Sequence, residues 1–192
     1  GHVPNEDVAE LLSQYPGRFW GFGGVDGTDT AGAMAEIDRI KAWGFKGVAL
    51  DNGWYAEPWY DDDERLDPVY QRCIEEGVVV SLTASIHVGP DLDYCHPRHI
   101  QRVAKKFPEM KIVVPHAGWP WTTLMCAVAF QCRNVHLIPD CYLNIPDMPG
   151  ADEYVKAINV YMDRRTLFAG EPRRLARRAF RSTRHAALST GY

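Results

Sequence analysis

One histidine in this chain stands at a position that suits chemistry. His116 follows the apolar run of residues 112–115 and precedes a turn of glycine, tryptophan and proline at residues 118–121. Imidazole titrates near neutral pH and binds zinc, so a histidine that directly follows a buried strand can act as a general acid/base or as a metal ligand. The other interpretation is a hydrogen-bonded histidine that packs beneath the tryptophans. Its placement at the end of a strand favours the functional one.

Two carboxylates occupy equivalent places. Asp51 and Asp140 each come directly after another apolar run. In a parallel sheet these side chains lie at the same edge as His116, where a carboxylate can orient a substrate or hold a water molecule. Asp51 also begins an Asp-Asn-Gly sequence, which is ordinary turn chemistry. Both aspartates are therefore candidate positioning groups, with a structural turn as the alternative.

Aromatic residues gather beyond the same strand ends. Trp54, Trp119 and Trp121 lie a few residues after the candidates above, and Thr83 ends the third apolar run. This density suggests the wall of a pocket for a planar or apolar ligand. Aromatic loops also cover the mouths of barrels without binding anything. We take these four residues as candidate substrate contacts.

Other polar groups suggest structure more than function. His87, His96 and His99 match no metal-binding spacing, and we expect them to be solvated loop residues. The acidic residues 61–64 precede a predicted helix, where negative charge suits the N-terminus. The five cysteines are widely spread and never have C-x-x-C spacing, which fits neither a disulfide framework nor a zinc cage. We expect most of them to be reduced core residues.

The elements that must position these residues alternate regularly. Apolar runs typical of strands begin near residues 18, 46, 78, 111, 134 and 165, the first covering residues 18–25 and the last residues 165–169. One helical pattern separates each run from the next. The predicted helices are one capped by Asn5, one stopped by Gly44, and four at residues 66–76, 97–106, 122–131 and 151–162. This alternation predicts a parallel sheet with right-handed crossovers.

Two architectures have this alternation. The chain contains neither a G-x-G-x-x-G nor a G-x-x-x-x-G-K-[ST] loop, which disfavours a doubly wound open sheet. We therefore predict an α/β fold of the (β/α)8 TIM-barrel type. Six strands are two fewer than closure requires, so we expect absent strands, a partner chain or a strongly distorted barrel. Unpaired strand edges also favour a homo-oligomer.

Composition narrows the function classes. The 192 residues are 46% hydrophobic, and charged side chains make up 24% of them. Such a composition suits one globular domain with a sizeable core. No run approaches the roughly 18 to 20 apolar residues that cross a bilayer, and no signal stretch opens the chain, so we expect a cytoplasmic protein without a membrane partner. The net charge of −4 argues against nucleic acid as a partner.

Residues 171–192 differ in composition from the rest of the chain, because they hold six arginines and one acid.

Several motifs together resemble the amidohydrolase superfamily. They are Tyr-Pro-Gly-Arg-Phe at 15–19, Gly-Phe-Lys-Gly-Val at 44–48, Asp-Pro-Val-Tyr at 67–70, the run from Phe107 to Trp121, and Arg-Thr-Leu-Phe-Ala at 165–169. The similarity covers roughly residues 5–170. It is strongest to the branch related to aminocarboxymuconate-semialdehyde decarboxylase, which includes hydrolases and nonoxidative decarboxylases.

This resemblance implies a (β/α)8 barrel with a divalent metal, usually zinc. The family holds its metal with an H-x-H pair on the first strand, a histidine ending the fifth and an aspartate ending the eighth. The histidine that ends its sixth strand acts in acid/base catalysis or as a further ligand, and His116 matches that position. The chain has no H-x-H, Thr83 takes the place of the fifth-strand histidine, and Glu171 replaces the aspartate only approximately. The first one or two β/α units are therefore expected to be absent, and any zinc would depend on His116 and Glu171.

The candidate residues and the family resemblance together predict one function, with one alternative. The first is a hydrolase or nonoxidative decarboxylase for a carboxylated or cyclic small molecule, with His116 as general acid/base and Asp51 and Asp140 as positioning groups. The alternative is a catalytically silent barrel that binds a ligand or a partner chain through its aromatic rim. In either case the barrel spans residues 1–170. Residues 171–192 form an Arg-rich tail, which we interpret as foreign or frame-shifted.

Overall fold

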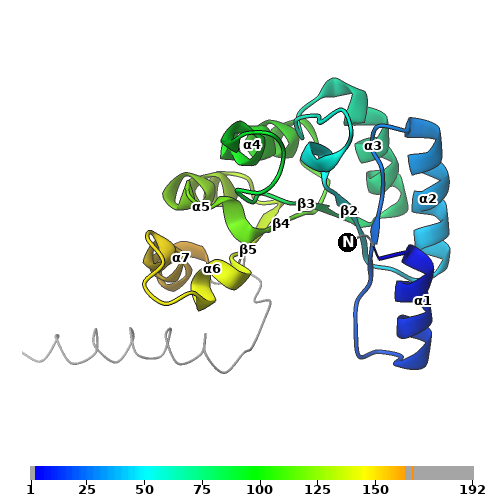
Figure 1. Ribbon diagram of the computed structural model, residues 1–192, viewed down its shortest axis with the longest axis horizontal. Coiled ribbons are helices and arrows are strands. Elements are labelled where there is room, and N and C mark those ends of the chain that lie inside the picture. The colour runs from blue at the N-terminus through cyan, green and yellow to red at the C-terminus, as the bar shows by residue number, and fades with distance from the viewer. Residues whose placement is uncertain (1–2, 163–165, 167–192) are drawn as a thin grey trace, which may run out of the picture.

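Short strands alternate with helices along the chain (Figure 1). The computed structural model describes residues 3–162 and residue 166. The strands are β1 (Phe22–Gly24), β2 (Gly47–Leu50), β3 (Val79–Leu82), β4 (Ile112–Pro115) and β5 (Val135–Ile138). The α-helices are α1 (Asn5–Gln14), α2 (Thr30–Ala42), α3 (Asp67–Glu76), α4 (Pro97–Lys106), α5 (Thr122–Gln131), α6 (Asp140–Asn144) and α7 (Ala151–Ala157), which continues as a π-helix (Ile158–Met162).

The strands form one parallel sheet whose spatial order equals their order in the chain. Helices α2 to α5 and α7 form an arc outside it (Figure 1). A doubly wound sheet would reverse its strand order and carry helices on both faces, so this topology is that of a β/α barrel. Among the described residues the barrel is incomplete, with five strands. Of the predicted strand at 165–169, only Thr166 is described, and it bridges in parallel to Leu137 of β5.

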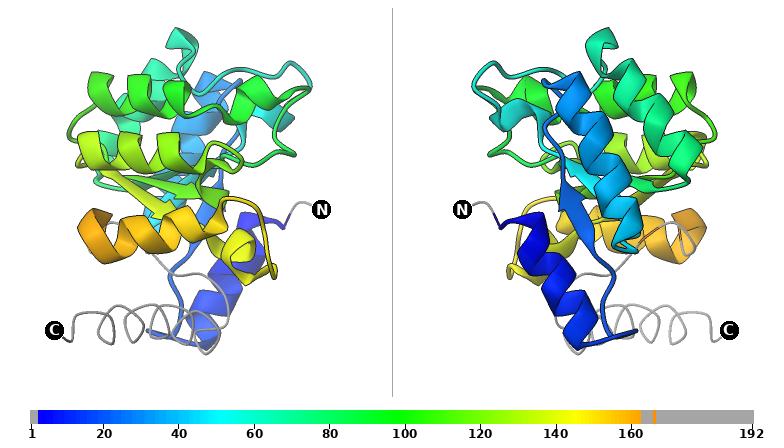
Figure 2. Two further views of the ribbon diagram at one scale, coloured as in Figure 1. Left: turned by 90° about the vertical axis from the view of Figure 1, so that its left-hand side faces the viewer. Right: turned by 90° about the vertical axis from the view of Figure 1, so that its right-hand side faces the viewer.

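The core lies between the sheet and its outer helices. Alternate strand residues are almost fully buried toward the helices, because successive side chains of a strand point to opposite faces. They are Val48, Leu50, Val80, Leu82, Ile112, Val114, Val135 and Leu137. Ile37 and Ile40 of α2 and Met125 of α5 are buried against the same layer. Figure 2 shows α4, α5 and α7 stacked side by side over one part of the sheet.

Several helix ends follow the predicted signals. Gly44 and Gly77 stop α2 and α3 with left-handed backbones, at φ values of 79° and 64° respectively. Glycine adopts this conformation without steric cost. The Asp29 side chain caps α2 by accepting from the backbone N–H of Gly32. Pro97 stands in the first turn of α4, where its missing N–H loses nothing. The prediction of α4 and α5 is confirmed at both ends.

The prediction at the N-terminal end was wrong in two details. Residues 18–21 are not part of the first strand, because the pairing of β1 with β2 begins only at Phe22, opposite Gly47. Trp20 is accordingly 80% exposed. Asn5 does not cap α1 either. It lies within the helix, accepts from the N–H of Gly24 at 2.8 Å and donates to its carbonyl at 2.9 Å. The amide of Asn5 thus pairs with the outer edge of β1 as a neighbouring strand would.

The acidic residues 61–64 do more than precede a helix. Asp63 caps the short 3-10 helix Glu64–Leu66 by accepting from the Arg65 N–H. Asp62 binds the Nδ1 of His99, which is only 2% exposed and stacks on Tyr60 with ring centroids 4.5 Å apart. The expectation that His99 is solvated was therefore wrong. Its imidazole links the acidic residues to α4.

Four of the five cysteines are buried, as expected, and Cys141 is exposed. Among the described residues, no helix combines the length and apolar character that crossing a membrane requires. The Arg-rich residues 171–192, including Glu171, lie outside the described part of the chain.

Candidate functional site

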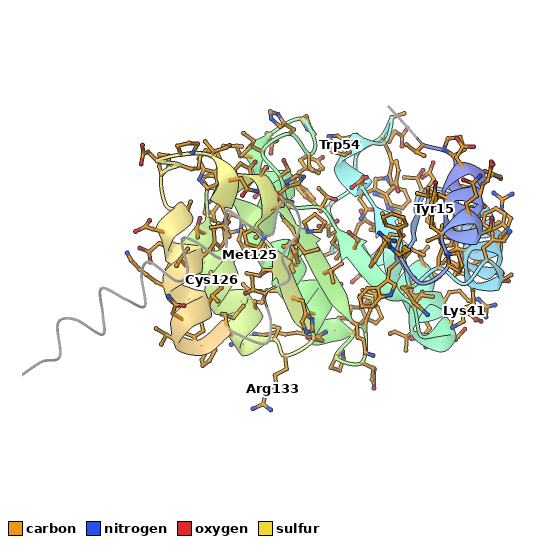
Figure 3. The ribbon with its side chains drawn as sticks, turned by 90° about the horizontal axis from the view of Figure 1, so that it is seen from below. Tyr15, Lys41, Trp54, Met125, Cys126 and Arg133 are labelled. Atoms are coloured by element: carbon orange, nitrogen blue, oxygen red, sulfur yellow. The ribbon has the colours of Figure 1, made fainter. Side chains whose placement is uncertain are left out.

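Parallel strands bring the predicted residues to one edge of the sheet. Asp51, Thr83, His116 and Asp140 lie just after the carboxyl ends of their strands. Figure 3 shows Trp54 at this end of the sheet and Arg133 at the opposite end. The structure places His116 and Asp140 in direct contact, because β4 and β5 are neighbours in register.

Asp140 holds His116 through two hydrogen bonds. The imidazole Nδ1 lies 3.0 Å from one carboxylate oxygen, and the backbone N–H of His116 donates to the other at 3.2 Å. A proton on Nδ1 serves the first bond in the neutral ring, which leaves the Nε2 lone pair as the base. Within residues 3–162 and 166, no hydrogen-bond partner meets Nε2. The His116 side chain is 33% exposed, so part of the imidazole is accessible to a small molecule.

The contact between His116 and Asp140 shifts the pKa of both side chains. The hydrogen bond with Asp140 raises the pKa of His116 against the opposing effect of burial, and the charges of Asp140 and Asp51 add to the rise. Burial alone would raise the pKa of Asp140, but hydrogen bonds from His116 and Cys141 outweigh it and lower the pKa. The ion pair therefore favours an imidazolium beside a carboxylate.

Backbone strain concentrates at these residues. His116, Ala117 and Asp140 have positive φ values of 64°, 49° and 23°. Residues other than glycine rarely adopt this region. The Ala117 carbonyl accepts from the buried Tyr154 hydroxyl at 2.9 Å, and the Gly118 N–H donates to the Ala84 carbonyl at 3.0 Å. These contacts from α7 and from the β3 end hold the loop in a conformation that would otherwise cost free energy. Strain of this kind clusters at functional sites.

Aromatic residues border His116 on one side. Tyr142 meets the imidazole edge-on, with centroids 6.0 Å apart, and stacks on Trp119 at 5.2 Å. The Trp119 indole N–H donates to the Pro149 carbonyl at 2.8 Å. Trp121 lies elsewhere, packed partly against the core with its ring 5.0 Å from that of His96. The structure thus brings Trp119, but not Trp121, into the aromatic group around His116, with Tyr142 between them.

Asp51 opens onto a cavity. Its Oδ1 is buried and has no hydrogen-bond partner among the described residues. Asp51 and Trp54 line a cavity of about 770 Å³ between β1, β2 and α1. Trp54 is 54% exposed, and its indole N–H donates to the His87 carbonyl. A buried carboxylate oxygen without a donor costs free energy, so Asp51 is held in its place by the packing around the end of β2.

Sequence reasoning missed Cys141 as a member of the site. Its Sγ lies 3.7 Å from the His116 Nδ1, and the ligand atoms of His116, Asp140 and Cys141 all lie within 4.8 Å of one another. Burial, followed by the hydrogen bond with Asp140, raises the pKa of the Cys141 thiol to about 11. The available signal was its place beside Asp140 just after β5, which it shares with the other strand-end candidates.

The metal implied by the sequence resemblance does not fit the residues present. At the fifth-strand position, β3 is followed by Thr83, whose hydroxyl is a poor ligand for zinc. The chain has no H-x-H pair, and Glu171 is not among the described residues. A four-ligand site of the expected kind is therefore not formed by the described part of the chain.

Comparisons with known proteins agree with this architecture. The sequence model of the amidohydrolase family matches residues 1–171. A solved TIM-barrel protein from Bordetella bronchiseptica, itself uncharacterized, is 36% identical with a TM-score of 0.82, and the match covers 88% of this chain and 59% of that one.

Two decarboxylases share the fold at lower identity. For 2,6-dihydroxybenzoate decarboxylase from Rhizobium the identity is 19% and the TM-score 0.67, covering 86% of this chain and 64% of that one. Dihydroxybenzoic acid decarboxylase from Polaromonas was solved with manganese and the inhibitor 2-nitroresorcinol. Its identity is 21% and its TM-score 0.63, and the match covers 86% of this chain and 62% of that one. The chain thus spans less than two thirds of the length of these structures.

Proposed function

This chain belongs to the amidohydrolase family, and from that premise we propose that it catalyses the nonoxidative decarboxylation or the hydrolysis of a small carboxylated molecule, with His116 as general acid/base. The observation that carries the proposal is the geometry of His116. Its Nδ1 is held by Asp140 at 3.0 Å, whereas its Nε2 has no hydrogen-bond partner among the described residues and the side chain is 33% exposed. A fixed, half-exposed imidazole with one available nitrogen is what proton transfer to a bound molecule requires.

Decarboxylation is the better supported of the two reactions. The bond between the ring carbon and the carboxylate carbon breaks, the electron pair stays on the ring carbon, and carbon dioxide leaves. The protonated Nε2 of His116 then supplies the proton of the new C–H bond. Asp140 favours the protonated ring, and so prepares it for this step. In hydrolysis the neutral Nε2 would instead take a proton from the attacking water.

Hydroxylated aromatic acids are the substrates that the site suits best. The relatives from Rhizobium and Polaromonas are named as decarboxylases of dihydroxybenzoates. In this chain Trp119 stacks on the buried ring of Tyr142 beside His116, and its partly exposed indole offers an aromatic surface. The Asp51 carboxylate, which lines the cavity, can accept from a ring hydroxyl. Trp54 and Thr83 are proposed as further substrate contacts.

The alternative is a barrel that binds such a molecule without converting it. The observation that favours it is Thr83, which stands where the family's fifth strand ends in a metal-binding histidine. A chain that lacks this ligand keeps a surface for binding but loses one source of charge stabilisation.

The test is a panel of ortho-hydroxylated benzoates and cyclic esters incubated with the 192-residue protein. We expect stoichiometric release of carbon dioxide and phenol from at least one benzoate. In the Asp51→Asn variant we expect a KM about tenfold higher, because a charge-assisted hydrogen bond to the substrate is lost. Binding of a benzoate with neither carbon dioxide nor hydrolysis product formed would contradict the enzyme proposal and support the silent barrel.

A further inference from the structure

The cluster of His116, Asp140 and Cys141 converges on one nitrogen. Both the Asp140 Oδ1, at 3.0 Å, and the Cys141 Sγ, at 3.7 Å, approach the Nδ1 of His116. In a nucleophilic triad the imidazole bridges its partners, with the nucleophile at one ring nitrogen and the carboxylate at the other. Here the thiol and the carboxylate share the same nitrogen, so the imidazole cannot relay a proton between them. The arrangement is instead that of three donor atoms that all lie within 4.8 Å of one another.

The spacing of these donors is close to that of ligands around a tetrahedral cation. Zinc lies about 2.3 Å from sulfur and about 2.0 to 2.1 Å from imidazole nitrogen or carboxylate oxygen, which places N and S about 3.6 Å apart and N and O about 3.4 Å apart. The observed separations are 3.7 Å from Nδ1 to Sγ and 3.0 Å from Nδ1 to Oδ1. The sulfur already stands at the required distance. The carboxylate oxygen must move roughly 0.4 Å away from Nδ1, because two ligands of one metal ion lie farther apart than two atoms that share a hydrogen bond.

We propose that the His116 Nδ1, an Asp140 carboxylate oxygen and the Cys141 Sγ form a binding site for a thiophilic divalent cation such as zinc. This ligand set differs from the one that the family resemblance implies, because it uses a thiolate and no H-x-H pair. It also differs from the manganese centre named for the Polaromonas relative, since sulfur ligands select zinc or cobalt over manganese.

Proton balance follows from the ligand set. The thiol proton of Cys141 leaves to water, and the proton on Nδ1 of a neutral His116 is replaced by one on Nε2. Each cation therefore releases one proton to the solvent at a pH where the imidazole is neutral. One thiolate and one carboxylate balance the dipositive charge, so the loaded site is neutral. The nearby carboxylate of Asp51 adds a negative potential that favours a cation.

The surroundings leave room for a fourth ligand. Cys141 is exposed and the His116 side chain is one-third exposed, so water or a solute can complete the tetrahedron. Three protein ligands with one open position are typical of zinc sites that do chemistry. The cation and the hydrogen bond from Nδ1 to Asp140 exclude each other. Metal binding at this site can be measured directly, without an assay of catalytic turnover.

The test is cobalt titration of the metal-stripped 192-residue protein, followed by competition with zinc. We expect one equivalent of cobalt with sulfur-to-cobalt charge-transfer absorption and the visible bands of a tetrahedral ion. The Cys141→Ser variant should lose the charge-transfer band and bind zinc at least about 100-fold more weakly, since even loss of an outer-shell partner costs about 10- to 100-fold. Cys141 is exposed, so the replacement leaves the core intact.

Two controls keep the outcome specific. Cys132→Ala removes a buried thiol away from the cluster and should leave the spectrum unchanged, as should His87→Gln for an exposed imidazole. A charge-transfer band that survives in Cys141→Ser would overturn the proposal, as would absence of stoichiometric cobalt binding or tighter binding of manganese than of zinc. None of these results depends on whether the protein turns over a benzoate.

Discussion

The buried carboxyl of Asp61 makes the stability of this protein depend on pH. Asp61 is 7% exposed, and its Oδ1 accepts from the Asn52 side-chain amide at 2.8 Å. Burial raises its pKa from 3.8 to about 7, with the Asn52 hydrogen bond opposing the rise and the charges of Asp62 and Asp51 adding to it. The Oδ1 of Asn52 has no partner among the described residues. An ionised Asp61 is therefore costly, and a neutral group in its place is not.

The size of the effect follows from the two pKa values. The pKa rise from 3.8 to about 7 means that at pH above 7 ionisation of Asp61 lowers the free energy of unfolding by roughly 4 kcal/mol. The folded state binds this proton more tightly than the unfolded state. The stabilisation that this bound proton provides is therefore complete below pH 4. It falls by about 1.4 kcal/mol per pH unit between pH 4 and 7, and is lost above pH 7. Asp61→Asn keeps the shape of the side chain and removes the titration, and its carbonyl oxygen can still accept from the Asn52 amide.

The assay is urea unfolding of wild type and Asp61→Asn at pH 5 and pH 8, followed by tryptophan fluorescence. At pH 8 we expect the variant to be more stable by roughly 2 to 4 kcal/mol, and its advantage to be about 2 to 3 kcal/mol smaller at pH 5. Asp147→Asn, at an exposed position, should change stability by less than about 0.5 kcal/mol at either pH. An advantage that is the same at both pH values, or a variant less stable than wild type at pH 8, would refute the reasoning.

Three further substitutions test the fold by the same urea assay. Asn5→Ala removes both hydrogen bonds to Gly24 at the edge of β1. It should lower stability by about 2 kcal/mol, because partly buried backbone groups lose their partners; an unchanged midpoint would be inconsistent with that role. Gly47→Ala places a Cβ 2.4 Å from the backbone carbonyl of Val79, and such overpacking should cost roughly 3 kcal/mol. Gly44→Ala meets nothing within 4 Å, and its left-handed backbone should cost only about 1 kcal/mol. Equal losses at the two glycines would argue against the close packing of β2 on β3.

Local signals predicted the helices because each end depends on one or two residues. Pro97 and Gly77 start and stop their helices by properties of their own backbones, whatever packs against them. The first strand was predicted too long because strand length depends on the partner, and β2 pairs only from Gly47 onward. Asn5 was taken for a cap because its bonding to Gly24 joins residues that are far apart in the sequence.

The candidate site was predictable to a similar depth. Strand-end positions were enough to nominate His116 and Asp140, since parallel neighbours bring their carboxyl ends together. The approach of Cys141 to the same nitrogen was not predictable, because it depends on the positive φ of Asp140, which turns the chain immediately after β5. The separation of Trp121 from Trp119 likewise depends on how the intervening turn packs.

The central claim is that His116 transfers a proton through its Nε2. The most direct measurement is kcat for His116→Gln beside the matched variant His87→Gln, with the benzoate that wild type converts fastest. We expect kcat to fall by about 10² to 10⁴-fold for His116→Gln, with KM changed only a few fold, and to stay at the wild-type value for His87→Gln. A His116→Gln protein that retains wild-type kcat would contradict the claim.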